Sequence, residues 1–553
     1  MALSSSLSLT TTLFSLLVFL LLSFAASHDG EPPLAPTPEP PPEIIGLIRK
    51  ACKASNDTLS CESSLIHSGR PPANATLMSI MQSALWVSSE NQNIAISMVN
   101  DLMESSPDNK NLTVAARHCM VGLIYGNYRT DLTVDALPRG RIKDARAWLS
   151  ATSGYQVGCA AGFRNVNNAT SKLNETVMFL ENLVVLTNNV LSMMMNYDNF
   201  GEDTTSWGPP KTERDGYWGR VDGWGDTSSL PVFKGGVPSG EEADVTVCKV
   251  GVCDYDTVQT AVDAAPSTGG RFVIWIKAGV YEEILRIPLE KKNVVFVGDG
   301  MGKTVITGAL SVGVSGVTTF DSATVGVVGD GFMARDLTIE NTAGSDAQQA
   351  VAFRSLSDHS ILENCEFLGN QDTLYPHSLR QFYKSCRIQG SVDFIFGNAA
   401  AIFQDCLILI APRQTDPEKG ANNAVTAHGR NLPAQSTGLV FWNCTINGTE
   451  EYMSLYHKNP QVHKTYLGRP WKQYSRAVFL NCTLAELIMP EGWMPWVGDF
   501  ALDTLYFGEL DNKGPGAPTS GRVSWSSKVP VEHVNTYSIQ NFIQGDDWIP
   551  TSH

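Results

Sequence analysis

A cysteine-centred pattern that recurs at regular intervals constrains the fold of this chain more than any other feature. Each copy has an apolar residue, any residue, Asn, Asp or Ser, then Cys, any residue and an apolar residue. The cysteines follow one another after 21, 20, 38 and 38 residues, at Cys365, Cys386, Cys406, Cys444 and Cys482. A coil that advances one turn in about 20 residues stacks equivalent positions about 4.8 Å apart. The spacing therefore predicts a solenoid built from stacked coils of β-strand.

The rest of the C-terminal part agrees with this prediction. Short β-prone runs, at 271–277, 293–297, 323–328 and 439–442, are separated by Gly, Asn and Asp. Such runs with a 20-residue recurrence are typical of a parallel β-helix. We therefore predict a right-handed parallel β-helix over residues 245–553. The alternative is a large β-sandwich. The turns of a sandwich would not repeat one cysteine motif at intervals of one and two coil lengths.

The N-terminal half has a different pattern of apolar residues. A chain of 553 residues is also too long for one hydrophobic core, so at least two domains are expected. Between residues 44 and 200 the apolar residues follow helical spacing, with few β-branched runs. We expect an all-α four-helix bundle here. Four cysteines suit two disulfide bonds, Cys52–Cys61 and Cys119–Cys159. A Gly-, Pro- and Trp-rich linker, residues 201–244, is expected to lie over a surface or to be mobile.

The first 43 residues and the composition indicate an exported protein. An apolar run at 13–26, followed by small residues, predicts a cleaved signal peptide at 1–27; a retained anchor is the alternative. Residues 28–43 form a Pro-rich spacer. A net charge of −16 argues against nucleic-acid binding, and no stable membrane association is expected after cleavage. Glycosylation sequons lie at Asn56, Asn74, Asn111, Asn168, Asn174, Asn443, Asn447 and Asn481.

Eleven cysteines in such a chain indicate disulfide bonds with at least one thiol left over. The candidates in the β-helix, Cys365, Cys386, Cys406 and Cys444, either pair with one another or fill the inside of the coil as small apolar residues. No cysteine or histidine group has zinc-like spacing, so no metal is expected.

Two aspartates 21 residues apart are the best candidates for chemistry. Asp372 and Asp393 are expected on neighbouring coils, and Asp393 stands among apolar residues, where a carboxylate needs a partner. Arg469 suits that task because a guanidinium binds a carboxylate bidentately. A single such pair is more simply interpreted as a structural salt bridge between Asp and Arg. The second aspartate nearby favours a catalytic role. Two nearby carboxylates separate their pKa values, so we expect one nucleophile, Asp393, and one general acid, Asp372.

The segments that carry these residues resemble the signature blocks of plant pectin methylesterases. They read GNQDTLY at 369–375, RQFYKSCRIQGSVDFIFGNA at 380–399 and YLGRPWK at 466–472. The resemblance runs from about residue 245 to the C-terminus. The helical half resembles the inhibitor domain of the same esterases, including its four cysteines, and would be a pro-region.

This resemblance implies a secreted cell-wall enzyme that hydrolyses methyl esters of homogalacturonan (pectin) without a cofactor. It makes Asp393 the nucleophile and Asp372 the proton donor, with Gln371 and Gln349 as hydrogen-bond donors to the oxyanion. Arg469 would orient Asp393. Trp471 and Thr319 match positions that contact the substrate. Pectinesterase inhibitor proteins and processing proteases are possible partners.

The chain also departs from the family pattern. Asn370 stands where an aromatic residue is common, and His428 where Gln is usual. Cys248 and Cys253 lie in a block where the family rarely has cysteines, and their spacing permits a small disulfide. The linker has no dibasic processing motif, only the isolated Lys211, Arg214, Arg220 and Lys234. A β-helix lyase or glycosidase, and a binding protein that acts through its helical domain, are the alternative functions.

Overall fold

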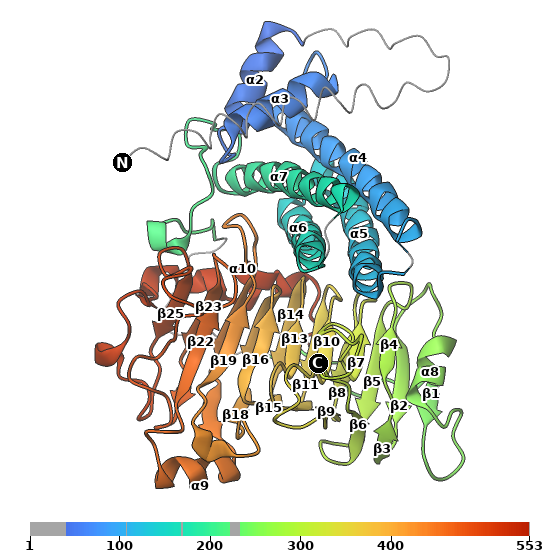
Figure 1. Cartoon of the computed structure of the whole chain (residues 1–553), viewed down its shortest axis with the longest axis vertical. Coiled ribbons are helices and arrows are strands. Elements are labelled where there is room, and N and C mark those ends of the chain that lie inside the picture. The colour runs from blue at the N-terminus through green and yellow to red at the C-terminus, as the bar shows by residue number, and fades with distance from the viewer. Residues whose placement is uncertain (1–39, 107, 168–169, 222–232, 552–553) are drawn as a thin grey trace.

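The structure is a computed structural model that describes residues 40–106, 108–167, 170–221 and 233–551. A helical domain stands on one side of a long β-helix, over its middle coils (Figure 1). Helices α5 and α6 lie nearest to the β-helix, and α2 and α3 lie farthest from it. The expected signal peptide, most of the Pro-rich spacer and the sequon at Asn168 lie outside the described residues.

The helical domain has more helices than the four that we expected. Four long helices form the bundle, and two short helices extend it at the end away from the β-helix. Each long helix except α6 begins at a side-chain cap, such as Thr76, whose hydroxyl accepts a hydrogen bond from the Ser79 amide. The helices are α2 (Pro42–Cys52), α3 (Thr58–Ser68), α4 (Leu77–Glu104), α5 (Lys110–Ala136), α6 (Ile142–Arg164) and α7 (Ser171–Phe200).

Disulfide bonds join neighbouring helices of this domain. Cys52 is bonded to Cys61 across the α2–α3 turn, and Cys119 of α5 is bonded to Cys159 of α6. A third bond, Cys248–Cys253, closes a small loop at the start of the β-helix. All three are pairs that the sequence suggested. Helix α7 has the length and hydropathy of a membrane span, but 61% of its apolar window is buried inside the protein.

The C-terminal part is a parallel β-helix, as predicted. Its strands form three sheets, and every pairing between them is parallel. Sheet A contains β1 (Val245–Val247), β2 (Phe272–Ile276), β5 (Val294–Gly298), β8 (Met333–Arg335), β11 (Ser360–Glu363), β14 (Arg380–Lys384), β17 (Ala400–Gln404), β20 (Gly438–Trp442), β23 (Arg476–Leu480), β25 (Tyr506–Leu510) and β26 (Ser527–Lys528).

The other two sheets complete each coil. Sheet B contains β3 (Gly279–Glu282), β6 (Thr304–Gly308), β9 (Thr338–Asn341), β12 (Glu366–Leu368), β15 (Arg387–Gly390), β18 (Leu407–Ile410), β21 (Thr445–Gly448) and β24 (Thr483–Leu484). Sheet C contains β4 (Leu285–Ile287), β7 (Val325–Val327), β10 (Phe353–Ser355), β13 (Leu374–Pro376), β16 (Val392–Gly397), β19 (Asn423–His428) and β22 (Thr465–Pro470). Short helices α8 (Val258–Ala264), α9 (Glu450–Lys458) and α10 (Ile539–Ile543) lie outside the sheets.

The repeated cysteine motif marks the corner between sheet A and sheet B. The residue before each cysteine has a left-handed backbone, with φ between 50° and 55°. Asn and Asp tolerate that conformation better than other residues with a Cβ, which explains their place in the motif. These corner residues are Asn364, Ser385, Asp405, Asn443 and Asn481. The following cysteine then points into the coil.

The cysteines inside the coil are free thiols, so the disulfide candidates among Cys365, Cys386, Cys406 and Cys444 are wrong. They fill the coil interior, which was the alternative. Most of them donate to a carbonyl of the preceding coil, for example Cys444 Sγ to Phe403 O at 3.2 Å. This inward stacking holds neighbouring coils in register without covalent bonds.

An aromatic stack lies beside the thiols. The rings of Tyr383, Phe403, Phe441 and Phe479 follow one another at centroid distances of 4.7, 4.7 and 4.4 Å, nearly parallel. These distances match the spacing of paired strands, because each ring comes from the equivalent position of the next coil. The stack extends the apolar core along the axis of the β-helix.

The described part of the linker lies over the β-helix surface. Glu213 is buried there, and the Trp218 ring stacks on His533 at 4.3 Å. The guanidinium of Arg214 donates to the carbonyls of Leu502 and Trp525.

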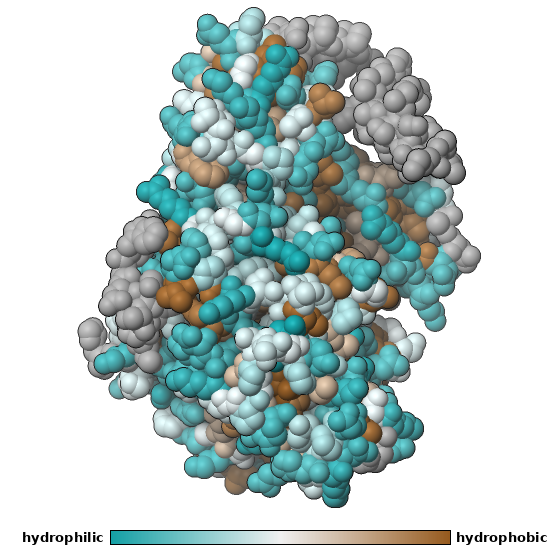
Figure 2. Space-filling model, turned by 90° about the vertical axis from the view of Figure 1, so that its left-hand side faces the viewer, coloured by the Kyte–Doolittle hydropathy of each residue, from teal (hydrophilic) through white to brown (hydrophobic). Residues whose placement is uncertain are grey.

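Figure 2 shows the face on this side of the molecule as mainly hydrophilic, with apolar side chains in small separate groups. Most of the described sequon asparagines are exposed: Asn56, Asn74, Asn111, Asn174, Asn443 and Asn481, with Asn447 half-buried.

Candidate active site

Asp372 and Asp393 lie on neighbouring coils of sheet C, as the 21-residue spacing predicted. The Asp372 amide donates to the carbonyl of Val392 at 3.2 Å, immediately before Asp393. An added Cβ at Gly390 would lie 2.2 Å from Phe394 Cβ and 2.8 Å from Asn370 O, so glycine permits this close approach of the two coils.

The backbone at both aspartates is unusual for non-glycine residues. Asp372 has φ of 64° and Asp393 has φ of 52°. The pairing of β16 with β19 also shifts register between Val392 and Ile395, which places two residues of β16 opposite one of β19. A bulge of this kind turns a side chain away from the regular alternation. Left-handed backbone and bulges cluster at functional sites, and here they present both carboxylates from one face.

Arg469 contacts Asp393 through both of its oxygens. Nε donates to Oδ1 at 2.8 Å and Nη2 donates to Oδ2 at 2.6 Å, from strand β22 to strand β16. The side chains are 18% and 7% exposed, so water screens this ion pair weakly. The partner that the sequence suggested for Asp393 is therefore present.

The two carboxylates differ in their electrostatic surroundings. Burial raises the pKa of Asp372 well above its usual value; the nearby Asp393 raises it further, and Arg469 opposes both effects. Burial also raises the pKa of Asp393, but the hydrogen bonds and charge of Arg469 offset part of that effect, and Arg413 adds to the offset. Asp372 is thus the carboxyl group that holds a proton more readily, and Asp393 is the one that is ionised more readily.

Two amide side chains lie beside the aspartates. Gln371 and Gln349 are half-buried, and among the described residues neither side chain has a hydrogen bond. They lie on adjacent coils, because the Ala350 amide donates to the Gln371 carbonyl at 3.1 Å. Both amide groups are thus available to a ligand. Thr319 is also half-buried, and the ring of the next residue, Phe320, lies 5.8 Å from the His377 ring.

Aromatic side chains cover the neighbouring surface of sheet C. Tyr375 stacks on Phe396 at 4.1 Å, and Trp471 meets Phe396 edge to face at 6.0 Å. Each of the first two residues is three positions after a candidate aspartate. Such a surface suits the apolar faces of sugar rings.

Sequence reasoning missed two residues of this site. The guanidinium carbon of Arg469 lies 4.3 Å from the centre of the Trp496 ring, and Trp496 packs against the apolar cluster that includes Tyr375 and Phe396. Arg413 acts electrostatically on Asp393. Both come from segments between the coils without a repeating pattern. The Met-Pro-Trp sequence at 494–496 was the available signal for Trp496.

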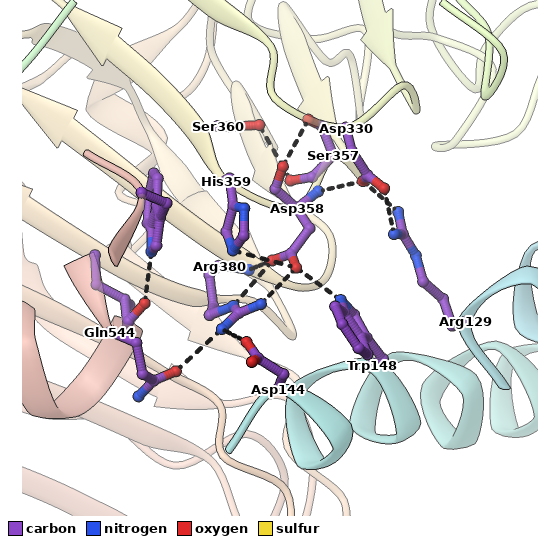
Figure 3. Close-up of polar contacts among 12 residues, drawn as sticks. Arg129, Asp144, Trp148, Asp330, Ser357, Asp358, His359, Ser360, Arg380 and Gln544 are labelled. Carbon is purple, nitrogen blue, oxygen red and sulfur yellow. Dashed lines mark hydrogen bonds and ion pairs between the residues drawn. The ribbon is translucent and has the colours of Figure 1, made fainter. Parts of the chain in front are cut away.

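The helical domain docks on the turns that join sheet C to sheet A, beside this surface. In Figure 3, Arg129 of α5 meets the Asp330 carboxylate with two hydrogen bonds of 2.7 Å, and the Trp148 indole of α6 donates to Asp358 at 2.8 Å. Arg380 binds Asp358 and also reaches Asp144 of α6 at 2.6 Å. These groups are largely buried, so the contact is a specific polar interface with an apolar surround.

An aromatic chain connects this interface to the candidate site. Tyr155 of α6 donates to or accepts from Ser378 at 2.8 Å, and its ring lies 5.7 Å from His377. The His377 ring in turn lies 4.8 Å from Tyr375. On the other side, His118 of α5 meets Asp321 at 2.9 Å, next to Phe320. The helical domain therefore covers the end of the aromatic surface that includes Phe320 and His377.

Comparison with known proteins identifies the family. The pectinesterase family profile matches residues 244–546, which contain every element of the candidate site. The probable pectinesterase/pectinesterase inhibitor 64 of Arabidopsis thaliana is 58% identical over 518 residues, which are 92% of this chain and 85% of that protein. The chain belongs to the pectinesterase family. It is an esterase, and the resemblance seen in the sequence is confirmed.

Other comparisons extend the likeness to both halves of this pectinesterase. The plant invertase/pectin methylesterase inhibitor profile matches residues 46–193, the helical domain. The probable pectinesterase/pectinesterase inhibitor 21 of Arabidopsis thaliana is 34% identical and covers 92% of this chain and 75% of its own length. Pectin methylesterase from carrot, a solved structure, is 47% identical with a TM-score of 0.53, over 56% of this chain and 95% of the carrot chain.

The departures from the family pattern have different surroundings. His428 is fully buried, its Nδ1 accepts from the Arg476 amide at 3.0 Å, and burial lowers its pKa well below the usual value. It is thus a neutral residue of the coil interior. Asn370 is half-buried beside the aspartates, and its carbonyl accepts from the Ser391 amide at 2.9 Å.

Proposed function

We propose that this enzyme hydrolyses the methyl esters of homogalacturonan to pectate and methanol. The observation that carries the proposal is the pair of aspartates on adjacent coils, of which only Asp393 is bound by Arg469. Related proteins are named for pectin, and the aromatic surface beside the aspartates suits a sugar polymer.

In the first half of the proposed reaction, a carboxylate oxygen of Asp393 attacks the ester carbonyl carbon. The carbonyl electron pair moves to its oxygen, and the amides of Gln371 and Gln349 donate hydrogen bonds to this oxyanion. The intermediate then collapses and breaks the bond to the methoxy group. Asp372 transfers its proton to that oxygen, so methanol leaves and an acyl-enzyme on Asp393 remains.

In the second half, the now ionised Asp372 takes a proton from a water molecule as the water attacks the acyl carbon. The acyl bond to Asp393 breaks, the galacturonate carboxyl is released, and both aspartates return to their first state. Arg469 orients Asp393 throughout and stabilises its negative charge. Thr319 and Trp471 would contact the sugar chain on either side of the ester.

We further propose that the helical domain restrains the esterase until it is displaced or removed. Tyr155 and His118 occupy the end of the surface on which the polymer would lie, beside Phe320 and His377. Pectinesterase inhibitor proteins and processing proteases are the expected partners. The three disulfide bonds and the exposed sequons agree with secretion to the cell wall.

Methanol release from methylated pectin tests the main proposal. The full chain is compared with Asp393→Asn, which keeps the shape of the side chain and removes its charge. We expect the variant to lose at least about 10³-fold in kcat. Equal methanol release by both proteins, at a rate well above that of pectin without protein, would contradict the mechanism. Loss of polymer viscosity without methanol release would favour a lyase or glycosidase instead.

A further inference from the structure

A cavity of about 100 Å³ lies where three parts of the chain meet. Helices α6 and α7 form one wall and the linker forms a second. The turn after β19, the start of β23 and the C-terminal segment form the rest. We propose that this cavity is a binding site for a small oxyanion of the size of phosphate. It is separate from the aspartate pair, and none of the proposed catalytic residues lines it.

The cavity is strongly cationic in a protein with a net charge of −16. Among the described residues, six cationic side chains and two carboxylates line it, and one of the six, Lys143, has a further interaction. The carboxylates are Asp198 and Glu213, and the cations are Lys143, Arg146, Lys211, Arg220, Arg430 and Arg476. A cleft lined by an excess of one charge concentrates counter-ions of the other sign. The excess of positive charge in this lining favours the binding of an anion.

One carboxylate of this lining forms ion pairs with two buried guanidinium groups. Glu213 forms an ion pair with Arg476 Nη1, and its second oxygen lies 3.7 Å from Arg430 Nη1. Arg476 and Arg430 are 7% and 2% exposed. Their charges repel each other, and one carboxylate compensates only one of them.

Two donors of the lining are buried and lack a hydrogen bond, although one of them, Arg430 Nη1, lies at ion-pair distance from Glu213. Within the described residues, Arg430 Nη1 and Arg146 Nε make no hydrogen bond. The other nitrogens of both side chains are engaged: Arg430 Nε donates to Leu432 O, and Arg146 Nη1 donates to Asp198. A buried donor without an acceptor is costly, and a guanidinium is well suited to an oxyanion. These donors are the second observation that indicates a ligand.

The size of the cavity selects the ligand class. One water molecule accounts for roughly 30 Å³ of the liquid, so the cavity holds about three waters or one small oxyanion. Phosphate and a short dicarboxylate such as malonate share the required chemistry. A bound anion would contact the helical domain, the linker and the β-helix together. Because it binds only the docked arrangement, it would hold the helical domain on the esterase.

Isothermal titration of the full chain with inorganic phosphate, at fixed ionic strength in Tris chloride, tests the site. A second titration with malonate distinguishes a tetrahedral anion from a carboxylate. We expect one of the two to bind with a stoichiometry of one. Arg430→Met should weaken this binding about tenfold or more, because it removes a charged donor. Should that variant fail to fold, Arg220→Gln at the exposed rim should weaken binding severalfold.

Arg49→Gln is the matched control, since it removes the same charge from an exposed position on the helical domain. It should bind as the unchanged chain does. Titrations without measurable binding of either anion would overturn the proposal. So would equal affinity in the unchanged chain, Arg430→Met and Arg220→Gln, because the anion would then bind elsewhere.

Discussion

Arg469 and Asp393 come from strands that are separated by one other strand in sheet C, and they meet through two parallel hydrogen bonds of 2.8 Å and 2.6 Å. This geometry fixes the orientation of the carboxylate as well as its charge. Asp372, one coil away, has no such partner among the described residues. The difference between the two aspartates is therefore made by a residue 76 positions further along the chain.

Arg469→Lys tests how much of this difference depends on bidentate geometry. Lysine keeps the positive charge but cannot donate two parallel hydrogen bonds to one carboxylate. We expect kcat for methanol release to fall about tenfold to a hundredfold, with a smaller change in KM. Steady-state kinetics on methylated pectin measures both. An unchanged kcat would show that charge alone suffices at this position.

Asp372→Asn should stabilise the protein while it inactivates the enzyme. The folded-state pKa of Asp372 is raised above its value of about 3.9 in an unfolded chain, so the folded state holds the proton more tightly. This contribution is fully present below the unfolded value and is lost as pH rises through the folded value. The Tm of the variant should therefore exceed that of the unchanged chain increasingly as pH rises.

Thermal unfolding between about pH 4 and pH 8 checks this prediction, and the two curves should meet at the acidic end. Asp393→Asn provides the comparison, because it leaves the half-buried Arg469 without its carboxylate and should lower Tm instead. A Tm for Asp372→Asn that is lower at every pH would contradict the raised pKa of Asp372.

Weakening the interface of the helical domain should increase activity if that domain restrains the esterase. Arg129→Gln removes the pair of hydrogen bonds to Asp330, and Trp148→Phe removes the donor to Asp358. We expect each change to raise methanol release severalfold. Limited proteolysis of the linker, run in parallel, reports whether the interface has opened. Interfaces that open without any gain in activity would rule out restraint, and Arg49→Gln controls for lost charge.

The repeat made the β-helix and the neighbourhood of Asp372 and Asp393 predictable from sequence. Coil length alone places equivalent residues side by side, so no knowledge of the turns is required. Arg469 was predictable for a different reason: a buried carboxylate needs a cation, and the segment around Arg469 supplies one.

Other features depend on backbone and packing that no periodicity encodes. The bulge at Asp393 and the left-handed φ of both aspartates leave no mark in a pattern of apolar residues. Trp496 and Arg413 reach the site from irregular segments. The cysteines were ambiguous because a small apolar residue and a disulfide partner look alike until the direction of the side chain is known. The docking of Trp148 on Asp358 joins residues 210 positions apart in separate domains.

Ser385 offers a direct test of the corner that defines the repeat. It is exposed and has φ of 52°, in a conformation that costs a residue with a Cβ roughly 1–2 kcal/mol. Ser385→Gly removes that cost, but glycine loses more backbone entropy on folding, by about 0.5–1 kcal/mol. We therefore expect a net gain of about 0.5–1 kcal/mol in the free energy of unfolding, measured by denaturant titration. Ser385→Val introduces a β-branched residue and should destabilise the protein.

Ser239→Gly is the matched control at an exposed serine without positive φ, where the same substitution should give no gain. A gain at Ser239 equal to that at Ser385 would show that the corner conformation is not the cause.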